Sequence, residues 1–158
     1  MPTTNLEPYL AKHSFFSGLD PADIEEIAGC AKNAAFKAGE YLFKQGENAE
    51  FFFVLREGHV VVEVPTARGH SIEISSLGEN QILGWSWLMP PYKYQFDCRA
   101  LKQTKVLEID GRCLRGKCES NPRLGYELIK RFARVMTNRL QETRLQLLDL
   151  YGAPADRS

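Results

Sequence analysis

Two β-strands and the turn between them are encoded by residues 51–64, FFFVLREGHVVVEV. Aromatic and β-branched side chains favour strands because they pack well on a pleated surface. Gly58 stands between the two apolar runs, where a tight hairpin needs the positive φ that glycine adopts without a steric penalty. The stretch therefore predicts a strand at 51–55, a turn at 56–58 and a second strand at 60–64.

The same pattern of apolar segments and turn glycines extends on both sides of this hairpin. Short apolar segments alternate with turn glycines about every ten residues, a spacing typical of antiparallel sandwiches and barrels. The glycines are Gly39, Gly46, Gly58, Gly69, Gly78 and Gly84. Further strands are predicted at 70–76, 95–100 and 105–110, so residues 34–110 are expected to form a β-roll.

Short helices are expected before the roll, within residues 6–32. Residues 6–12 predict the first helix. Asp20 followed by Pro21 is typical of an N-cap and a proline at the first helical position, where the missing N–H costs nothing. Helical spacing on one apolar face then continues through Ile24, Ile27, Ala28 and Ala31.

The C-terminal part of the chain, residues 111–151, is expected to be helical. Asn121-Pro122 repeats the cap-and-proline signal. Nothing in the sequence breaks a helix from 123 to about 150. Residues 152–158 then form a tail.

This long helix carries two apolar stripes. The longer one follows heptad spacing through Tyr126, Ile129, Ala133, Met136, Leu140, Thr143, Leu147 and Leu150. The shorter one covers only the first half, through Leu124, Leu128, Phe132 and Val135. One stripe docks the helix on its own domain, and the other needs a partner, since each large apolar side chain left in water forfeits about 1.5–3 kcal/mol.

A two-fold homodimer is the simplest partner for the longer stripe. Its seam is expected at Ile129, Met136, Leu140, Leu147 and Leu150. The alternative is that both stripes pack within one chain on a broad helix face. The dimer is favoured because the longer stripe continues for two turns after the shorter one ends.

The composition fits one soluble domain, residues 1–151. The chain has 158 residues, of which 44% are hydrophobic and 25% charged, ordinary values for a globular protein. No signal peptide and no run of about 20 apolar residues occurs, which favours a cytoplasmic protein without a membrane partner.

Direct binding of nucleic acid by this chain alone is not expected. Basic and acidic residues balance at 20 each, whereas DNA-binding proteins usually carry a basic surplus. The arginines and lysines of the long helix, Arg139 among them, alternate with acids and predict a solvated charged face. Only eight residues follow Leu150, too few for a helix-turn-helix, so the chain is either free-standing or a fragment of a larger regulator.

No pattern indicates catalysis or a metal site. The three histidines form no closely spaced pair, and no nucleophile or phosphate-loop motif occurs. The cysteines lack CxxC spacing and are expected to be reduced, mostly buried small residues: Cys30, Cys98, Cys113 and Cys118. A non-catalytic protein is therefore predicted.

The order of these parts resembles the cyclic-nucleotide-binding domain, in particular the sensor half of Crp/Fnr-type bacterial regulators. Residues 36–47 are similar to the family's first hairpin, 52–60 to the strand-turn-strand with the third glycine, and 139–143 to a stretch of its central helix. The resemblance implies a mainly β jelly roll (a double-stranded β-helix) with N-terminal helices and a long C-terminal dimerisation helix. It also implies a regulatory sensor whose effector is a cyclic nucleotide, cyclic AMP or cyclic GMP.

The family's phosphate-binding cassette uses a glutamate for the ribose hydroxyl and an arginine for the cyclic phosphate. The matching stretch here is residues 84–96, GWSWLMPPYKYQF, with Trp85 at the glutamate position and Tyr94 at the arginine position. Lys93, one residue away, is the expected source of positive charge. The predicted ligand-binding residues are Gly84, Trp85, Ser86, Trp87, Leu88, Lys93, Tyr94, Gln95 and Thr143.

The loss of both charged anchors leaves two functions open. In the first, a cyclic nucleotide or a flatter, less charged ligand binds between residues 84–96 and the long helix of a homodimer. In the second, Trp85 and Trp87 fill the old pocket, and the chain is a ligand-independent dimerisation or protein-interaction module. An open cavity lined by Lys93, Tyr94 and Thr143 would count against the second function, and a pocket filled by indole rings would support it.

Overall fold

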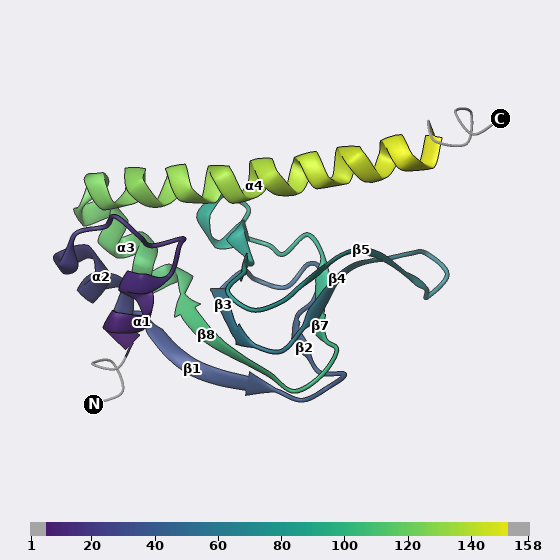
Figure 1. Cartoon of the computed structure of the whole chain (residues 1–158), viewed down its shortest axis with the longest axis horizontal. Helices are drawn as coiled ribbons and strands as arrows, with labels where there is room; N and C mark the ends of the chain where they lie inside the picture. The colour runs from purple at the N-terminus through teal and green to yellow at the C-terminus, as the bar shows by residue number, and fades with distance from the viewer. Residues whose placement is uncertain (1–5, 152–158) are drawn as a thin grey trace.

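A computed structural model describes residues 6–151 as eight strands and flanking helices (Figure 1). The strands are β1 (Ala31–Phe36), β2 (Tyr41–Phe43), β3 (Phe51–Glu57), β4 (Val60–Pro65), β5 (Ser71–Leu77), β6 (Ile82–Leu83), β7 (Asp97–Ala100) and β8 (Thr104–Asp110). The helices are α1 (Leu6–Lys12), α2 (Pro21–Ala28), the short 3-10 helix η2 (Trp85–Leu88), α3 (Gly111–Ser120) and α4 (Pro122–Tyr151).

The strands form two antiparallel four-stranded sheets, as expected for a jelly roll. One sheet has the order β1-β8-β3-β6 and the other the order β2-β7-β4-β5. At several glycine turns the chain passes from one sheet to the other, and Gly58, between β3 and β4, is one of them, with a φ of +105°. Helices α1, α2 and α3 gather at one end of the roll, and α4 runs along one side (Figure 1). The predicted jelly roll is thereby confirmed.

Strand β3 is the central element of the core because both of its faces are covered. Phe52, Phe53, Val54 and Leu55 are all at most 2% exposed. Phe53 points into the roll, where its ring packs against Phe43, and Phe52 points the other way, toward the helices. A strand covered on both faces reads as a continuous apolar run rather than an alternating one, which explains the sequence that begins at Phe51.

Helix α4 docks through the shorter of its two apolar stripes. Leu124, Leu128 and Phe132 are fully buried, and the Phe132 ring meets Phe52 edge-on at a centroid distance of 5.1 Å. At the start of the helix, Arg123 donates to both carboxylate oxygens of the buried Asp23 on α2, at 2.7 and 2.8 Å. The first half of α4 is therefore fixed to the domain, whereas Leu147 and Leu150 in the second half are exposed.

The boundary between the first helices and the roll differs from the prediction. Helix α2 ends at Ala28, and Ala31 begins β1 by pairing with Ile109 of β8. The roll therefore starts at residue 31 and not at residue 34, because strand pairing overrides the helical spacing that Ala31 shares with Ile24 and Ile27. The predicted tail, 152–158, lies outside the described residues.

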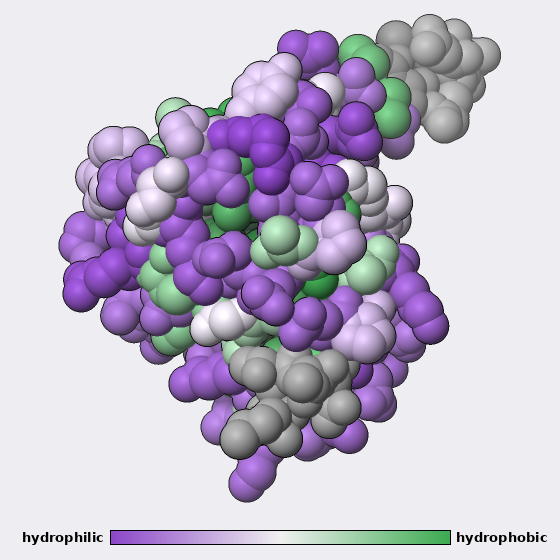
Figure 2. All heavy atoms as spheres, turned by 90° about the vertical axis from the view of Figure 1, so that its left-hand side faces the viewer, coloured by the Kyte–Doolittle hydropathy of each residue, from purple (hydrophilic) through white to green (hydrophobic). Residues whose placement is uncertain are grey.

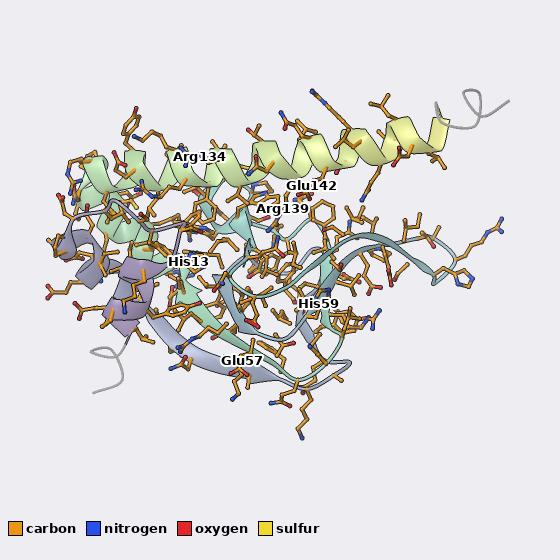
Figure 3. The ribbon with its side chains drawn as sticks, in the orientation of Figure 1. His13, Glu57, His59, Arg134, Arg139 and Glu142 are labelled. Carbon is orange, nitrogen blue, oxygen red and sulfur yellow. A yellow bond between two sulfur atoms is a disulfide. The ribbon has the colours of Figure 1, made fainter. Side chains whose placement is uncertain are left out.

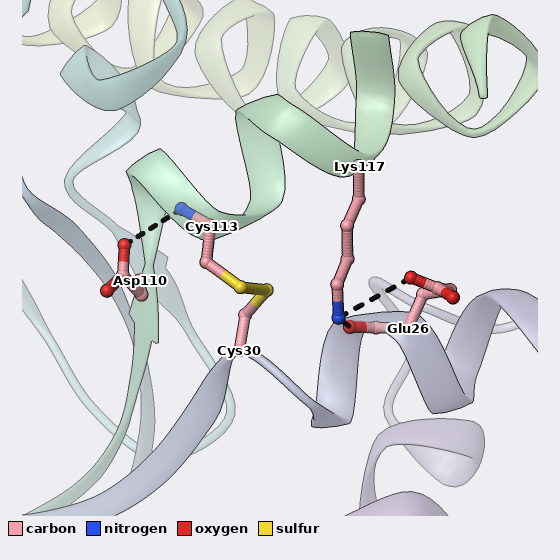
Figure 4. Close-up of a disulfide and its surroundings, with 5 residues drawn as sticks. All are labelled: Glu26, Cys30, Asp110, Cys113 and Lys117. Atoms are coloured by element: carbon pink, nitrogen blue, oxygen red, sulfur yellow. Dashed lines mark hydrogen bonds and ion pairs between the residues drawn. A yellow bond between two sulfur atoms is a disulfide. The ribbon is translucent and has the colours of Figure 1, made fainter. Parts of the chain in front are cut away.

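The cysteines also differ from the prediction, since Cys30 and Cys113 form a disulfide across 83 positions of sequence (Figure 4). Cys30 lies just before β1, which pairs with β8, and Cys113 lies in the first turn of α3, which follows β8 directly. Asp110 caps this turn by accepting from the Cys113 backbone N–H at 3.0 Å. The prediction of reduced cysteines is therefore wrong for this pair, whereas Cys98 and Cys118 are free, as predicted.

Metal-binding clusters and membrane-spanning helices are both absent from residues 6–151. No group of three or more His, Cys, Asp or Glu side chains in this part of the chain is arranged to hold a metal ion. None of its helices combines the length and the apolar character needed to cross a membrane.

Two glycines with similar backbone angles predict different costs of substitution. Gly39 has a φ of +91° and open space where a Cβ would lie, whereas a Cβ on Gly58 would lie 2.6 Å from the Thr104 Cα. Gly39→Ala is expected to lower the free energy of unfolding by about 1–2 kcal/mol, from the backbone alone. Gly58→Ala adds a steric term of about 1–3 kcal/mol. Urea unfolding measures both, and equal losses would contradict the hairpin geometry.

Candidate ligand cavity

A cavity of about 260 Å³ lies between the roll, the cassette and α4. The roll contributes mainly apolar side chains, among them Phe43, Val62 and Ile74. The cassette contributes Gly84, Trp85, Ser86, Tyr94, Gln95 and Phe96. Helix α4 closes the remaining side with Met136, Arg139, Leu140, Glu142, Thr143 and Gln146. Mainly apolar walls with a few polar groups are typical of small-molecule sites.

Gly84 sets the direction of the cassette. Its φ is +89°, and a Cβ at this position would lie 3.3 Å from the Phe51 carbonyl oxygen on β3. Glycine is required because it adopts this angle freely and lets the backbone pass close to the strand. The chain can therefore leave β6 and turn at once into η2, with Trp85 as its first residue.

The two tryptophans of η2 have different environments. Trp87 is fully buried, stacks on Phe52 at a centroid distance of 5.3 Å and meets the edge of Phe132 at 5.7 Å. It is part of the core beneath α4 and does not line the cavity. Trp85 is half-buried and forms one wall of the cavity. The structure therefore does not place the two indole rings in the old pocket, which remains open.

Tyr94, predicted to stand at the family's arginine position, is an uncharged ring. It is 4% exposed and stacks on Phe43 at a centroid distance of 3.9 Å. Its hydroxyl donates to the Phe51 carbonyl oxygen at 2.6 Å, and burial raises the pKa of this hydroxyl. The ring thus lines the cavity, while its polar atom is occupied by β3.

Lys93 does not supply the positive charge that the sequence predicted for the cavity. Its Nζ donates to Asn48 Oδ1 at 2.5 Å, and the residue is absent from the cavity lining. Its backbone also pairs with Asn48 in an isolated β-bridge, so Lys93 is held at the segment before β3 and not at the cavity. Leu88 packs against the hydrophobic core, again outside the cavity.

Of the nine predicted ligand-binding residues, three lie outside the cavity: Trp87, Leu88 and Lys93. The other six are brought together around it: Gly84, Trp85, Ser86, Tyr94, Gln95 and Thr143. Thr143 lies on α4, and its Oγ1 donates to the Arg139 carbonyl oxygen at 3.0 Å.

Arg139 lines the cavity although the sequence did not predict it there. It reaches from α4 toward the roll (Figure 3), where its guanidinium donates to the Ile82 carbonyl oxygen and lies 4.9 Å from the centre of the Trp85 ring. Burial lowers its pKa to about 10. The prediction placed it on a solvated face. The missed signal is its spacing, four residues before Thr143 and three after Met136, which places all three on one helix face.

Comparison with known proteins agrees with this architecture. Residues 34–121, more than half of the chain, match the family model described as the cyclic nucleotide-binding domain. The chain is 26% identical over 144 residues to a protein named as a potassium channel protein of Rhodopseudomonas palustris. That alignment covers 90% of this chain but only 34% of the relative, so the chain spans about a third of its length.

Solved structures with similar folds cover most of the chain. A protein described as a cyclic nucleotide-binding protein from Geobacter metallireducens superposes with a TM-score of 0.75 at 28% identity, covering 89% of this chain and 98% of that one. The sensor domain of the transcriptional regulator DNR from Pseudomonas aeruginosa gives a TM-score of 0.72 at 20% identity, covering 89% and 94%. The predicted resemblance is confirmed.

The two tryptophans provide a direct check of this geometry. Trp87→Ala removes a fully buried indole between Phe52 and Phe132 and is expected to lower the free energy of unfolding by about 3–5 kcal/mol. Trp85→Ala removes a half-buried cavity wall and its contact with Arg139, at an expected cost below about 2 kcal/mol. Urea unfolding of the two variants measures the difference. Equal losses would mean that the cassette is packed differently.

Proposed function

Because the chain belongs to the cyclic nucleotide-binding domain family, we propose that it is a non-catalytic regulatory sensor whose small-molecule effector binds between the cassette and α4. The observation that carries this proposal is the open cavity of about 260 Å³ at that position. A cavity filled by the two indole rings would have favoured the ligand-independent module instead. Cyclic AMP and cyclic GMP are the first effectors to test.

The output of the sensor is a change in the position of α4. This helix forms one side of the cavity through Met136, Leu140 and Thr143, and its first half is docked by Phe132. An effector in the cavity contacts the helix beyond its docked part. It shifts the helix only by the difference in its affinity for the two helix positions.

The exposed side of α4 supports a homodimer as the form in which the sensor acts. Figure 2 shows hydrophobic side chains on the projecting end of this helix. The seam residues Ile129, Leu140, Leu147 and Leu150 are 50–65% exposed, and Met136 is partly buried against the core. A second copy of the helix would cover the exposed leucines and recover part of their burial free energy.

The proposal includes no contact with nucleic acid or membrane by this chain. Two of the basic residues on α4, Lys130 and Arg131, are paired with Glu127 at 3.2 and 2.7 Å. This single carboxylate offsets one of the two positive charges, and over the whole sequence acidic and basic residues balance at 20 each.

Calorimetric titration with cyclic AMP and cyclic GMP tests the sensor. We expect saturable binding of at least one of them, with one ligand per chain. Ser75→Phe places a ring in the cavity and is expected to abolish binding. Ser76→Phe is the matched control, because Ser76 is exposed and does not line the cavity. If the unmodified chain binds neither nucleotide, cyclic-nucleotide sensing is rejected.

Sedimentation velocity tests the dimer. Leu147→Asp places a charge in the seam and is expected to convert a dimer into a monomer. Leu145→Asp is the control, since Leu145 is an equally large exposed side chain, 62% exposed, on the opposite face of the helix from the seam. A dimer that survives Leu147→Asp, or one that only Leu145→Asp breaks, would show that the interface lies elsewhere.

A further inference from the structure

The cavity contains a positive charge that the described part of the protein does not neutralise. Among the described residues that line it, Arg139 is the single cation and Glu142 the single carboxylate. Glu142 influences Arg139 electrostatically, but within residues 6–151 no carboxylate comes within 4.0 Å of the guanidinium. Arg139 is half-buried, and a charge that is partly removed from water without a paired opposite charge carries a desolvation cost.

Other arginines of the domain are held differently. Arg99 is paired with Glu63 at 3.1 Å, and Arg131 with Glu127 at 2.7 Å. Arg139 has instead one backbone acceptor, the Ile82 carbonyl oxygen, and the face of the Trp85 ring. A guanidinium carries five N–H donors, so most of its donors have no acceptor among residues 6–151. These donors suit an oxyanion, which a guanidinium binds in a bidentate manner.

The rest of the cavity suits a flat ring. Trp85 and Phe96 line it on the cassette side, and Tyr94 stacked on Phe43 lines it on the roll side. Aromatic walls bind planar groups by offset stacking or edge contacts. Ser75, Ser86 and Gln95 add polar side chains to the lining. The walls and Arg139 together match a ligand with one planar heterocycle and one oxyanion.

We propose that Arg139, supplied by α4 and not by the cassette, binds the anionic group of the effector, and that the effector is therefore a singly charged nucleotide-like anion. This inference rests on the proposed function of the cavity. It reverses the family's arrangement, in which the anion is held by the cassette. The anionic group of the ligand then competes with the Ile82 carbonyl oxygen for the Arg139 guanidinium. Because Arg139 belongs to α4, the charge of the ligand acts directly on the output helix.

The experiment compares each nucleotide with its uncharged nucleoside. Cyclic AMP against adenosine, and cyclic GMP against guanosine, isolate the contribution of the phosphate to affinity. For a hydrogen-bonded charge pair we expect the nucleotide that binds to be favoured by about 10- to 100-fold over its nucleoside. Arg139→Gln is expected to remove this preference while leaving the affinity for the nucleoside within about threefold. Arg139→Lys is expected to retain part of it, because the charge remains but the bidentate geometry is lost.

Arg134→Gln is the matched control. Arg134 is an exposed arginine of the same helix that does not line this cavity, so its replacement is expected to leave the nucleotide preference unchanged. Thermal unfolding of each variant shows whether it is folded. If Arg139→Gln does not fold, the test is the expected partial loss of the nucleotide preference in Arg139→Lys.

The outcomes distinguish a failure of the proposed role of Arg139 from a failure of the proposed sensor function. If the unmodified chain binds a cyclic nucleotide that Ser75→Phe excludes, and the preference over the nucleoside survives Arg139→Gln, the sensor stands and the role of Arg139 is wrong. If nucleotide and nucleoside bind the unmodified chain equally, the role of Arg139 is again wrong. If neither cyclic nucleotide binds at all, both proposals fail.

Discussion

The contact on which the structure depends is the aromatic cluster of Phe132, Phe52 and Trp87. These three rings come from α4, β3 and η2, and their centroids lie 5.1 to 5.7 Å apart. They share one buried site, so the helix, the central strand and the cassette have a fixed relative position. Edge-on and offset contacts of this kind define orientation as well as burial. Without this cluster, the cassette and the helix would have no reason to face each other across a cavity.

The cavity follows from where this cluster ends. Arg139 lies seven residues after Phe132, which is two turns or about 10 Å along the helix. Met136 still packs against the core, but beyond it the helix leaves the core, and Arg139 and Thr143 line its face toward the cavity. The same helix is therefore rigidly held at one end and in contact with the cavity at the other. A ligand in the cavity therefore contacts the half of the helix that does not pack on the core.

The sequence predicted the parts of this arrangement that depend on local chemistry. Turn glycines, proline caps and the run from Phe51 to Leu55 identified the roll, and Gly84 and Thr143 were placed at the cavity from the family pattern. It assigned the positive charge of the cavity to Lys93, whereas the structure has Arg139 there. The direction of Lys93 depends on its pairing with Asn48, 45 positions away, and the burial of Arg139 depends on how far α4 lies over η2. The disulfide was missed for the same reason, since Cys30 and Cys113 meet only after β1 pairs with β8. Properties that are fixed by tertiary contact leave little trace in a single sequence.

A crystal structure of the protein grown with cyclic AMP tests the central claim most directly, namely that α4 and the cassette enclose a ligand cavity whose charge comes from the helix. We expect density for the nucleotide against Trp85, with its phosphate on the Arg139 guanidinium and Trp87 still packed on Phe132. An indole ring in that space, or a cassette separated from α4 with no cleft between them, would contradict it.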